Sequence, residues 1–476
     1  MIQKYEMVVG LEVHVELNTK SKIFCSCSTK FGASPNTNVC PVCMGLPGTL
    51  PVLNKRAVEY AIKAGLATGC SIAEDTRLDR KNYFYPDLPK AYQISQYDTP
   101  LCYGGKINIT TSSGQKDVRI NRIHIEEDAG KLIHDTEHGT MIDYNRCGVP
   151  LIEIVSEPDI CGAEEAKAYL TALRAIILYT GISDCRMNEG SFRCDVNLSV
   201  RKKGYTALGV RTEMKNINSF AFVAKAIEYE FQRQVSVIES GERVVPETRR
   251  FDSGTGKTYA MRSKESAADY RFFPEPDILP FKVDGETVKR LKKEIPMLPH
   301  ERKIIYVEKY KLTSSDADVI VSDPHLARYF ENAAKLTDFP KLAANILLSE
   351  LLALSSQEDF DCPISFAALS EIADLSGEQT INSVTVKKLI KMLLLSEYSS
   401  HSVRDIVKEK DLSQINDREL LKDILNSVIT NNPKLISDYK NGKTAARKAI
   451  MGKVMSQTEG KANPVILNTL FDEITL

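Results

Sequence analysis

The sequence lacks any long uninterrupted apolar run, and this absence limits the class of protein. No stretch of its 476 residues approaches the roughly 20 consecutive apolar residues that cross a bilayer. The first ten residues, MIQKYEMVVG, also lack the apolar core of a signal peptide. With 43% apolar and 26% charged residues, the composition excludes a collagen-like or largely disordered chain. We therefore expect a folded cytoplasmic protein with no membrane element.

An excess of one charge sign is also lacking, because the formal net charge is only −1. The chain as a whole therefore does not indicate nucleic-acid binding. One segment near the carboxyl end is an exception, and its basic residues outnumber its two acidic ones, Asp438 and Glu459. This segment is either a phosphate-contacting surface or an ordinary solvated helix face. Its basic residues are Lys434, Lys440, Lys443, Arg447, Lys448, Lys453 and Lys461.

A secreted disulfide framework is not expected either, since the eleven cysteines are an odd number and most are scattered through a large chain. Four of them form two close pairs, Cys25-x-Cys27 and Cys40-x2-Cys43. Two tight turns that face each other can supply four thiolates to a tetrahedral zinc ion. A redox pair is the alternative, but it leaves two cysteines unexplained. With four protein ligands the zinc has no open position, so its role would be structural.

Length and pattern predict an α+β protein of several domains, because 476 residues exceed what one core usually holds. Residues 1–294 mix alternating strands with a few helices and predict a mixed-sheet domain. Pro296 and Pro299 then mark a linker. Beyond them the strand signals vanish, and we expect an all-helical domain over 295–407 and a small helical tail domain over 408–476.

Local patterns predict individual elements of the first domain. Apolar residues at helical spacing end at Gly181 and Gly241, which are natural helix caps. The segment Ser253–Thr258 contains Gly-Lys-Thr, but Phe251 occupies the position of the first glycine of a phosphate loop, so a hairpin is favoured. Besides the opening run from Gly10, strands are predicted at 106–110, 118–125, 149–155, 194–201 and 210–214.

Acidic side chains recur within these strands. Glu12 and His14 lie about 7 Å apart along the opening strand, on the face opposite Leu11 and Val13. Glu153 is flanked by Leu, Ile and Val, and burying its carboxylate unpaired would cost several kcal/mol, so it needs a cation. Converging carboxylates and an imidazole suit Mg²⁺, although pairing with nearby basic residues is an alternative. The other acids in such contexts are Glu126, Glu127, Asp195 and Glu213.

Several longer motifs resemble the B subunit of the tRNA-dependent amidotransferases. The resemblance runs from residue 5 to the carboxyl end of the chain. Its motifs are Gly10–Leu17, Asp79–Asp87, Pro89–Gln96, His124–Lys131, Pro150–Asp159 and Asp269–Asp277.

The resemblance implies a cradle domain, a helical domain and a tRNA-contacting tail. It also implies a reaction, the ATP-dependent conversion of misacylated Glu-tRNA(Gln) or Asp-tRNA(Asn) to Gln-tRNA(Gln) or Asn-tRNA(Asn). In that reaction ATP phosphorylates the side-chain carboxylate, and ammonia displaces the phosphate. This chain has no recognisable amidase signature. We therefore expect ammonia to come from an amidase (glutaminase) A subunit, within a heterotrimer that includes a small C subunit.

The resemblance also implies site residues. Glu12, His14, Glu127 and Glu153 fall on positions associated with Mg²⁺, with Glu126 a possible substitute for its neighbour. Asp195 and Glu213 lie nearby as cofactor-binding candidates, and Lys81 lies in a motif near the ammonia gate. The zinc of Cys25, Cys27, Cys40 and Cys43 is expected to brace the loop after the first metal-bearing strand. The tail predicts an RNA surface that includes Lys443, Arg447 and Lys448.

Overall fold

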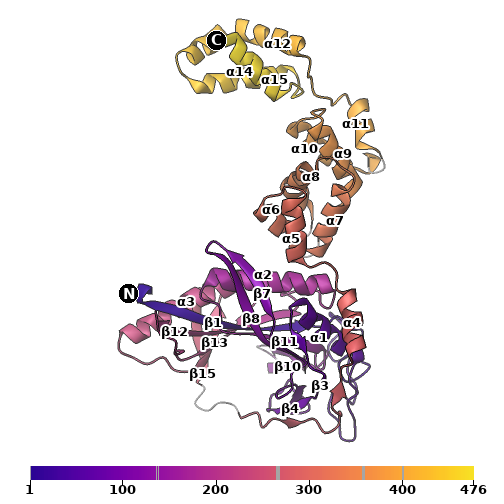
Figure 1. Cartoon of the computed structure of the whole chain (residues 1–476), viewed down its shortest axis with the longest axis vertical. Coiled ribbons are helices and arrows are strands. Elements are labelled where there is room, and N and C mark those ends of the chain that lie inside the picture. The colour runs from indigo at the N-terminus through magenta and orange to yellow at the C-terminus, as the bar shows by residue number, and fades with distance from the viewer. Residues whose placement is uncertain are drawn as a thin grey trace. The chain divides into compact units, whose positions relative to one another are not determined.

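The computed structural model divides the chain into two compact units, Met1–Glu301 and Arg302–Leu476. It describes residues 2–135, 137, 139–263, 269–355, 360–398 and 401–475. Figure 1 shows the strands gathered in the first unit and helices in the second. The α+β class predicted from the sequence is confirmed.

The first unit is built on a ten-stranded sheet whose order is β15-β14-β13-β12-β1-β11-β8-β6-β2, with β7 paired to β8. All its pairings are antiparallel except that of β13 with β14, so the sheet is mixed. Its strands are β1 (Tyr5–Glu16), β2 (Ser71–Ile72), β6 (Cys102–Tyr103), β7 (Lys106–Thr111), β8 (Gly114–Glu127), β11 (Pro150–Ser156), β12 (Phe192–Lys202), β13 (Thr212–Ile217), β14 (Glu247–Asp252) and β15 (Lys257–Ser263).

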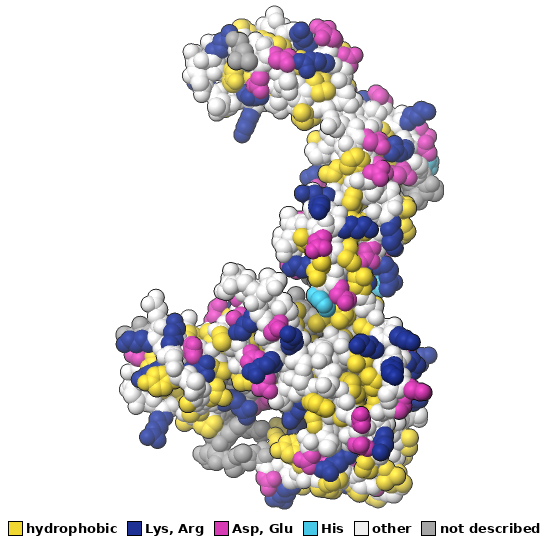
Figure 2. Space-filling model, in the orientation of Figure 1, with side chains coloured by type: hydrophobic (Ala, Val, Ile, Leu, Met, Phe, Trp, Pro, Cys, Tyr) yellow, Lys and Arg dark blue, Asp and Glu magenta, His cyan; other side chains and the backbone are white. Residues whose placement is uncertain are grey.

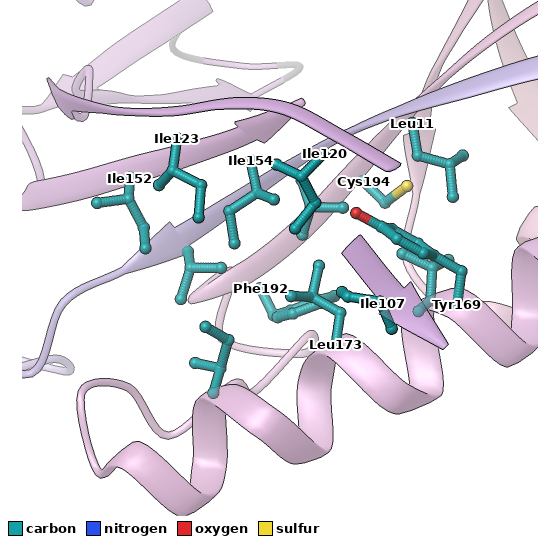
Figure 3. Packing of buried hydrophobic residues seen from close by; sticks show 14 of the residues in the cluster. Leu11, Ile107, Ile120, Ile123, Ile152, Ile154, Tyr169, Leu173, Phe192 and Cys194 are labelled. Atoms are coloured by element: carbon teal, nitrogen blue, oxygen red, sulfur yellow. The ribbon is translucent and has the colours of Figure 1, made fainter. Parts of the chain in front are cut away.

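One face of this sheet is apolar and packs on helices. Leu11, Ile154 and Phe192 are fully buried there with Tyr169 and Leu173 of α2, as the close view in Figure 3 shows. Gly181 ends α2 in the left-handed conformation, as its position in the sequence predicts. The helices of this unit are α1 (Lys55–Ala67), α2 (Ala163–Thr180), α3 (Phe220–Glu239) and α4 (Gly285–Glu294).

Smaller strand pairs lie outside the main sheet. The pair β4–β5 matters for function, because β5 contacts the end of β8 and β4 carries Lys81. The predicted hairpin at 253–258 is also found, because β14 and β15 pair across it. These additional strands are β3 (Asp75–Thr76), β4 (Asp79–Asn82), β5 (Tyr92–Ser95), β9 (Lys131–Asp135), β10 (Gly139–Asp143), β16 (Phe273–Pro274) and β17 (Phe281–Lys282).

The second unit contains only helices among its described residues. Part of it, around Leu425, Ile450 and Phe471, forms a hydrophobic cluster of its own. The separate tail domain from residue 408 stays a prediction. The helices are α6 (Ser314–Val321), α7 (Pro324–Ala334), α8 (Pro340–Ile346) followed by a π-helical turn (Leu347–Leu351), α9 (Phe366–Gly377), α10 (Ser383–Leu393), α11 (Val403–Glu409), α12 (Arg418–Thr430), α13 (Pro433–Lys440), α14 (Thr444–Gln457) and α15 (Pro464–Thr475), while α5 (Pro299–Glu308) crosses the boundary between the units.

Within the described ranges, every helix is too short or too polar to cross a lipid bilayer.

Candidate active site

The polar face of the sheet carries the acidic residues, opposite the face that packs on the helices. The side chains of a strand alternate between faces, so Glu12 and His14 of β1 share one face while Leu11 and Val13 occupy the other. The antiparallel register then sets Glu12 opposite Asp195 of β12 and His14 opposite Glu153 of β11. Residues far apart in the sequence thereby become neighbours.

One group on this face consists of His14, Glu126 and Glu153, which we call the first acid group. A ligand atom of each lies within 4.8 Å of those of the others, which is close enough for one metal ion to contact all three. His14 Nε2 lies 3.5 Å from Glu153 Oε2. Glu126 and Glu153 are almost fully buried, whereas His14 is partly exposed. The group is therefore reachable from the surface through its imidazole side.

Glu126 is fixed by donors on β5 and by its own strand. Ser95 Oγ donates to Glu126 Oε1 at 2.8 Å, and Gln93 Nε2 donates to Glu126 Oε2 at 3.1 Å. His124 Nε2 lies 2.9 Å from Glu126 Oε1 and 3.6 Å from Glu153 Oε2. Sequence reasoning missed His124 as a site residue, although its spacing of two from Glu126 already places both on one face.

The charges of this group depend on one another. Burial raises the pKa of Glu126, but Lys81 and the two histidines outweigh it and lower the pKa far below its usual range. Burial also opposes the charged form of His14, yet the carboxylates of Glu153 and Glu126 overcome it and raise the pKa of His14. The pKa of Lys81 is raised by Glu126 and Glu153 against the effect of its burial. The group therefore stays anionic at neutral pH, with Lys81 as a nearby counter-charge.

A second acid group consists of Glu12, Asp195 and Glu213, and their ligand atoms also lie within 4.8 Å of one another. Lys215 Nζ donates to Asp195 Oδ2 at 2.5 Å and pairs with Glu213 Oε1 at 2.9 Å. Burial and the charge of Glu153 raise the pKa of Glu12, so the two acid groups are electrostatic neighbours on one face. The structure thus brings together six of the acidic and imidazole candidates in two adjacent groups.

Glu127 lies outside both groups, which corrects its expected place beside His14 and Glu153. It belongs to the opposite face of β8, together with Ile125. Its Oε1 accepts a hydrogen bond from Ile94 N at 2.9 Å. The same oxygen forms an ion pair with the ammonium of Lys90. Glu127 therefore lines a cavity of about 260 Å³ with Lys90, Lys22 and Cys43. Glu126, named above as a possible substitute for its neighbour, lies in the first acid group instead.

Lys81 lies on β4, within electrostatic reach of Glu126 and Glu153. Its ammonium is 5.1 Å from the centre of the Tyr270 ring and 6.0 Å from that of Tyr83, so the faces of both rings attract its positive charge. Among the described residues the close lysine–glutamate contact in this region is that of Lys90 with Glu127 and not one made by Lys81.

The four cysteines of the two predicted pairs lie together. The sulfur atoms of Cys25, Cys27, Cys40 and Cys43 lie within 4.8 Å of one another. Lys22 Nζ lies 3.6 Å from the Cys43 sulfur, and a hydrogen bond from Cys25 together with this ammonium lowers the pKa of Cys43 to about 4. Soft thiolate donors in one cluster fit a zinc ion, so the donor set agrees with the expected metal.

The loop that holds these cysteines is tied to the far ends of β8 and β11. Ile23 N donates to Gly148 O at 2.9 Å, and Gly148 N donates to Asp128 O at 2.8 Å. Lys22 Nζ also donates to Tyr144 O at 3.2 Å. The loop that follows β1 is therefore hydrogen-bonded to the segment just before β11, and bracing of this connection by the cluster stays a prediction.

This geometry defines a class of protein, one in which a large mixed sheet packs helices on its apolar face and clusters carboxylates and imidazoles on its polar face. Comparison with known sequences identifies the class further. Residues 7–289 match the GatB/GatE catalytic domain and residues 328–474 match the GatB domain. The chain belongs to the GatB family, the B subunits of the tRNA-dependent amidotransferases.

Curated relatives share the whole length of the chain. The B subunit of the aspartyl/glutamyl-tRNA(Asn/Gln) amidotransferase of Caldicellulosiruptor saccharolyticus is 52% identical over 477 residues, covering 99% of both chains. The protein of the same name from Thermoanaerobacter pseudethanolicus is 50% identical over 473 residues, and that from Thermodesulfovibrio yellowstonii is 48% identical over 474, again with 99% of both chains covered. The resemblance inferred from the sequence motifs is confirmed, and with it the general role of an amidotransferase B subunit.

We predict that Glu153→Gln lowers the pKa of His14, because the variant removes the carboxylate that favours the imidazolium. The raised pKa of His14 stabilises the native fold below the unfolded-state value, and this contribution is lost as pH rises through the folded-state value. NMR titration of the imidazole, assigned with His14→Gln, measures the shift. Glu242→Gln, at an exposed position, serves as the control. An unchanged His14 titration in Glu153→Gln would contradict the geometry of the first acid group.

Proposed function

We propose that the chain catalyses the ATP-dependent step that amidates misacylated Glu-tRNA(Gln), Asp-tRNA(Asn) or both. In this reaction the side-chain carboxylate of the misacylated amino acid takes the terminal phosphoryl group of ATP, and ammonia then displaces inorganic phosphate to form the amide. The enzyme would be a glutamine-hydrolysing carbon–nitrogen ligase with this chain as its kinase and transamidase subunit.

The supporting observation is the convergence of the two acid groups on one polar sheet face, within electrostatic reach of the Lys81 ammonium. A scaffold that only holds RNA has no use for buried, mutually repelling carboxylates, because each costs free energy unless a cation neutralises it. A phosphoryl-transfer site requires such positions, since divalent cations bind one or two carboxylates together with substrate phosphates.

The residues present fit Mg²⁺, because carboxylate and imidazole ligands converge within reach of one ion. His14, Glu126 and Glu153 of the first acid group would hold the ion. When bound, the ion would neutralise the charge of the phosphate oxygens. Glu126 is prevented from rotating by Ser95 and Gln93, so the group is preorganised. Asp195 and Glu213 would contribute to nucleotide binding through the second acid group.

The ammonia would come from a partner. The chain has no recognisable amidase signature of its own, so we propose that a glutaminase A subunit supplies the ammonia. We also propose that this subunit and a small C subunit form a heterotrimer with the chain, in the cytoplasm. Lys81 is placed near the first acid group, so its ammonium would stabilise negative charge that develops where ammonia meets the activated carboxylate.

Glu153→Gln should strongly slow amidation while tRNA binding is retained. Loss of one carboxylate from the first acid group lowers cation affinity, and the rate should fall by roughly 100-fold or more, since groups outside the ligand shell alone are worth 10–100-fold. The measurement is ATP hydrolysis and amide formation with each misacylated tRNA in the assembled complex. Glu242→Gln is the matched control. Retained activity in Glu153→Gln would leave only an RNA-binding scaffold.

Lys81→Met should lower glutamine-driven amidation more than amidation driven by free ammonia, if the Lys81 ammonium takes part in ammonia delivery. Methionine keeps the length of the side chain and removes its charge. The two rates are compared in the same complex at saturating ATP. Equal retention of both rates would dispose of this role for Lys81.

We also propose that Cys25, Cys27, Cys40 and Cys43 bind a structural zinc ion. Cys43→Ser should lower the zinc content measured by elemental analysis to well below one ion per chain. Cys161→Ser, at an exposed cysteine outside the cluster, should leave the zinc content unchanged. If Cys43→Ser keeps a full zinc ion, the cluster is not the site.

The tail surface would contact the phosphates of tRNA. Figure 2 shows dark blue basic side chains over the tail, with magenta acidic ones among them. Two of the predicted residues are already engaged, since Lys443 Nζ donates to Asp438 and Arg447 donates to Asn468 and Asp472. Lys448 is exposed, and the described residues give it no ion-pair partner.

Lys448→Ala should therefore weaken tRNA binding more than Arg447→Ala does. It should also reduce the slope of log K against log salt by about 1, the change expected for one lost phosphate contact. Binding is measured over a salt series, with Lys335→Ala, at the exposed cap that follows α7, as control. Affinity and slope that stay equal to wild type would remove the tail surface from the tRNA interface.

A further inference from the structure

Lys22 is a buried lysine beside the cysteine cluster, and no carboxylate neutralises it at close range. Its side chain is among the largest that are fully buried, with 1% of the residue exposed. In the described part of the chain, no carboxylate oxygen lies within 4.0 Å of its ammonium. A buried ammonium is strongly unfavourable unless a negative charge compensates it. Lys22 therefore needs a negative partner of another kind.

The Lys22 ammonium faces a sulfur atom of the cluster. Lys22 Nζ lies 3.6 Å from Cys43 Sγ and donates to Tyr144 O at 3.2 Å. The carbonyl is neutral, so the sulfur is the contact that can carry the compensating charge. Cys43 is itself buried, and Cys40 N donates to the same sulfur at 3.2 Å. Two donors that converge on one buried sulfur favour a thiolate there.

Lys22 also contacts the other cysteine pair. Its backbone N donates to Cys27 O at 2.9 Å, so the main chain of Lys22 holds the first pair while its side chain faces the second. Lys90 lines the same cavity as Lys22, but its ammonium forms an ion pair with Glu127. Of these two lysines, Lys22 is thus the one whose charge is directed at the sulfur atoms.

The charge of a zinc centre fits this lysine. Four thiolates carry more charge than one zinc ion neutralises, so a site with four cysteine ligands is anionic. A buried anionic site needs a nearby cation for the same reason that a buried ammonium needs an anion. A disulfide, in contrast, is neutral and would leave Lys22 uncompensated. The position of Lys22 therefore favours metal-bound thiolates over a redox pair.

We propose that Lys22 is the charge partner of the cysteine cluster. Its ammonium neutralises part of the negative charge of the four thiolates, through the sulfur of Cys43, and thereby raises the affinity of the cluster for zinc. Lys22 does not bind the ion itself and is a positioning residue. The inference rests on the proposed zinc site and is independent of the acid groups on the sheet.

The zinc affinity of the full-length chain tests this role, measured by competition with a chromophoric chelator. Lys22→Met keeps most of the length of the side chain and removes its charge. It should lower the affinity by about 10- to 100-fold, the range typical of changes just outside a ligand shell. Lys22→Gln, which is polar but uncharged, should lose affinity to the same extent. Lys30→Met, at an exposed lysine of the same loop, should bind zinc as wild type does.

The absorption spectrum of the Co²⁺-loaded chain separates charge from packing. An ammonium beside a thiolate sulfur stabilises the electrons that are transferred to the metal. Its removal should therefore move the sulfur-to-Co²⁺ charge-transfer band to longer wavelength in Lys22→Met and Lys22→Gln, but not in Lys30→Met. An affinity and a band that stay equal to wild type would overturn the role of Lys22. A lower affinity with an unmoved band would also overturn it, because packing alone would then explain the loss.

Failure of the zinc site itself gives a different result. A wild-type chain that binds neither ion, or a Cys43→Ser chain that binds both as wild type does, would refute the proposed zinc site and this role of Lys22 with it. If zinc is lost in Cys43→Ser while both Lys22 variants behave as wild type, only the role of Lys22 is refuted.

Discussion

The site depends on one constraint, that carboxylates buried on a sheet face must be neutralised by cations. Glu153 lies at the centre of this constraint, between His14 on one neighbouring strand and His124 on the other. Histidines, the Lys81 ammonium and side-chain donors on β5 offset part of the cost of its burial and that of Glu126. In the proposed function, the remaining negative charge gives the face its affinity for cations. The apolar face of the sheet keeps these carboxylates and imidazoles in place, because the close-packed core behind β1 and β11 fixes the register of the strands.

The antiparallel register turns this constraint into two distinct acid groups. Each strand contributes alternate residues to the polar face, and pairing of β1 with β11 and β12 selects which of them meet. On the side of β11 and β8, the imidazoles of His14 and His124 lie beside the buried carboxylates of Glu126 and Glu153. On the side of β12 and β13, Lys215 forms ion pairs with Asp195 and Glu213. The cysteine cluster lies at one end of the sheet, where its loop is hydrogen-bonded to the residues that precede β11.

Much of this arrangement could be predicted from the sequence. The alternation of Leu11, Val13 and Val15 with Glu12, His14 and Glu16 fixes the two faces of β1, and the spacing of the four cysteines anticipates their cluster. The same alternation, applied to Ile123 and Ile125, would have placed Glu126 with His124 on the polar face and Glu127 on the other. The pairing of Lys215 with Asp195 and of Lys90 with Glu127 could not be predicted, because it depends on contacts between strands that no local pattern encodes.

The most direct test of the account is the position of a divalent ion in crystals of the chain soaked with Mn²⁺, located by anomalous scattering. The account predicts the strongest peak among His14, Glu126 and Glu153, within ligand distance of all three side chains. A strongest peak beside Glu127, or none at the first acid group at saturating Mn²⁺, would contradict it.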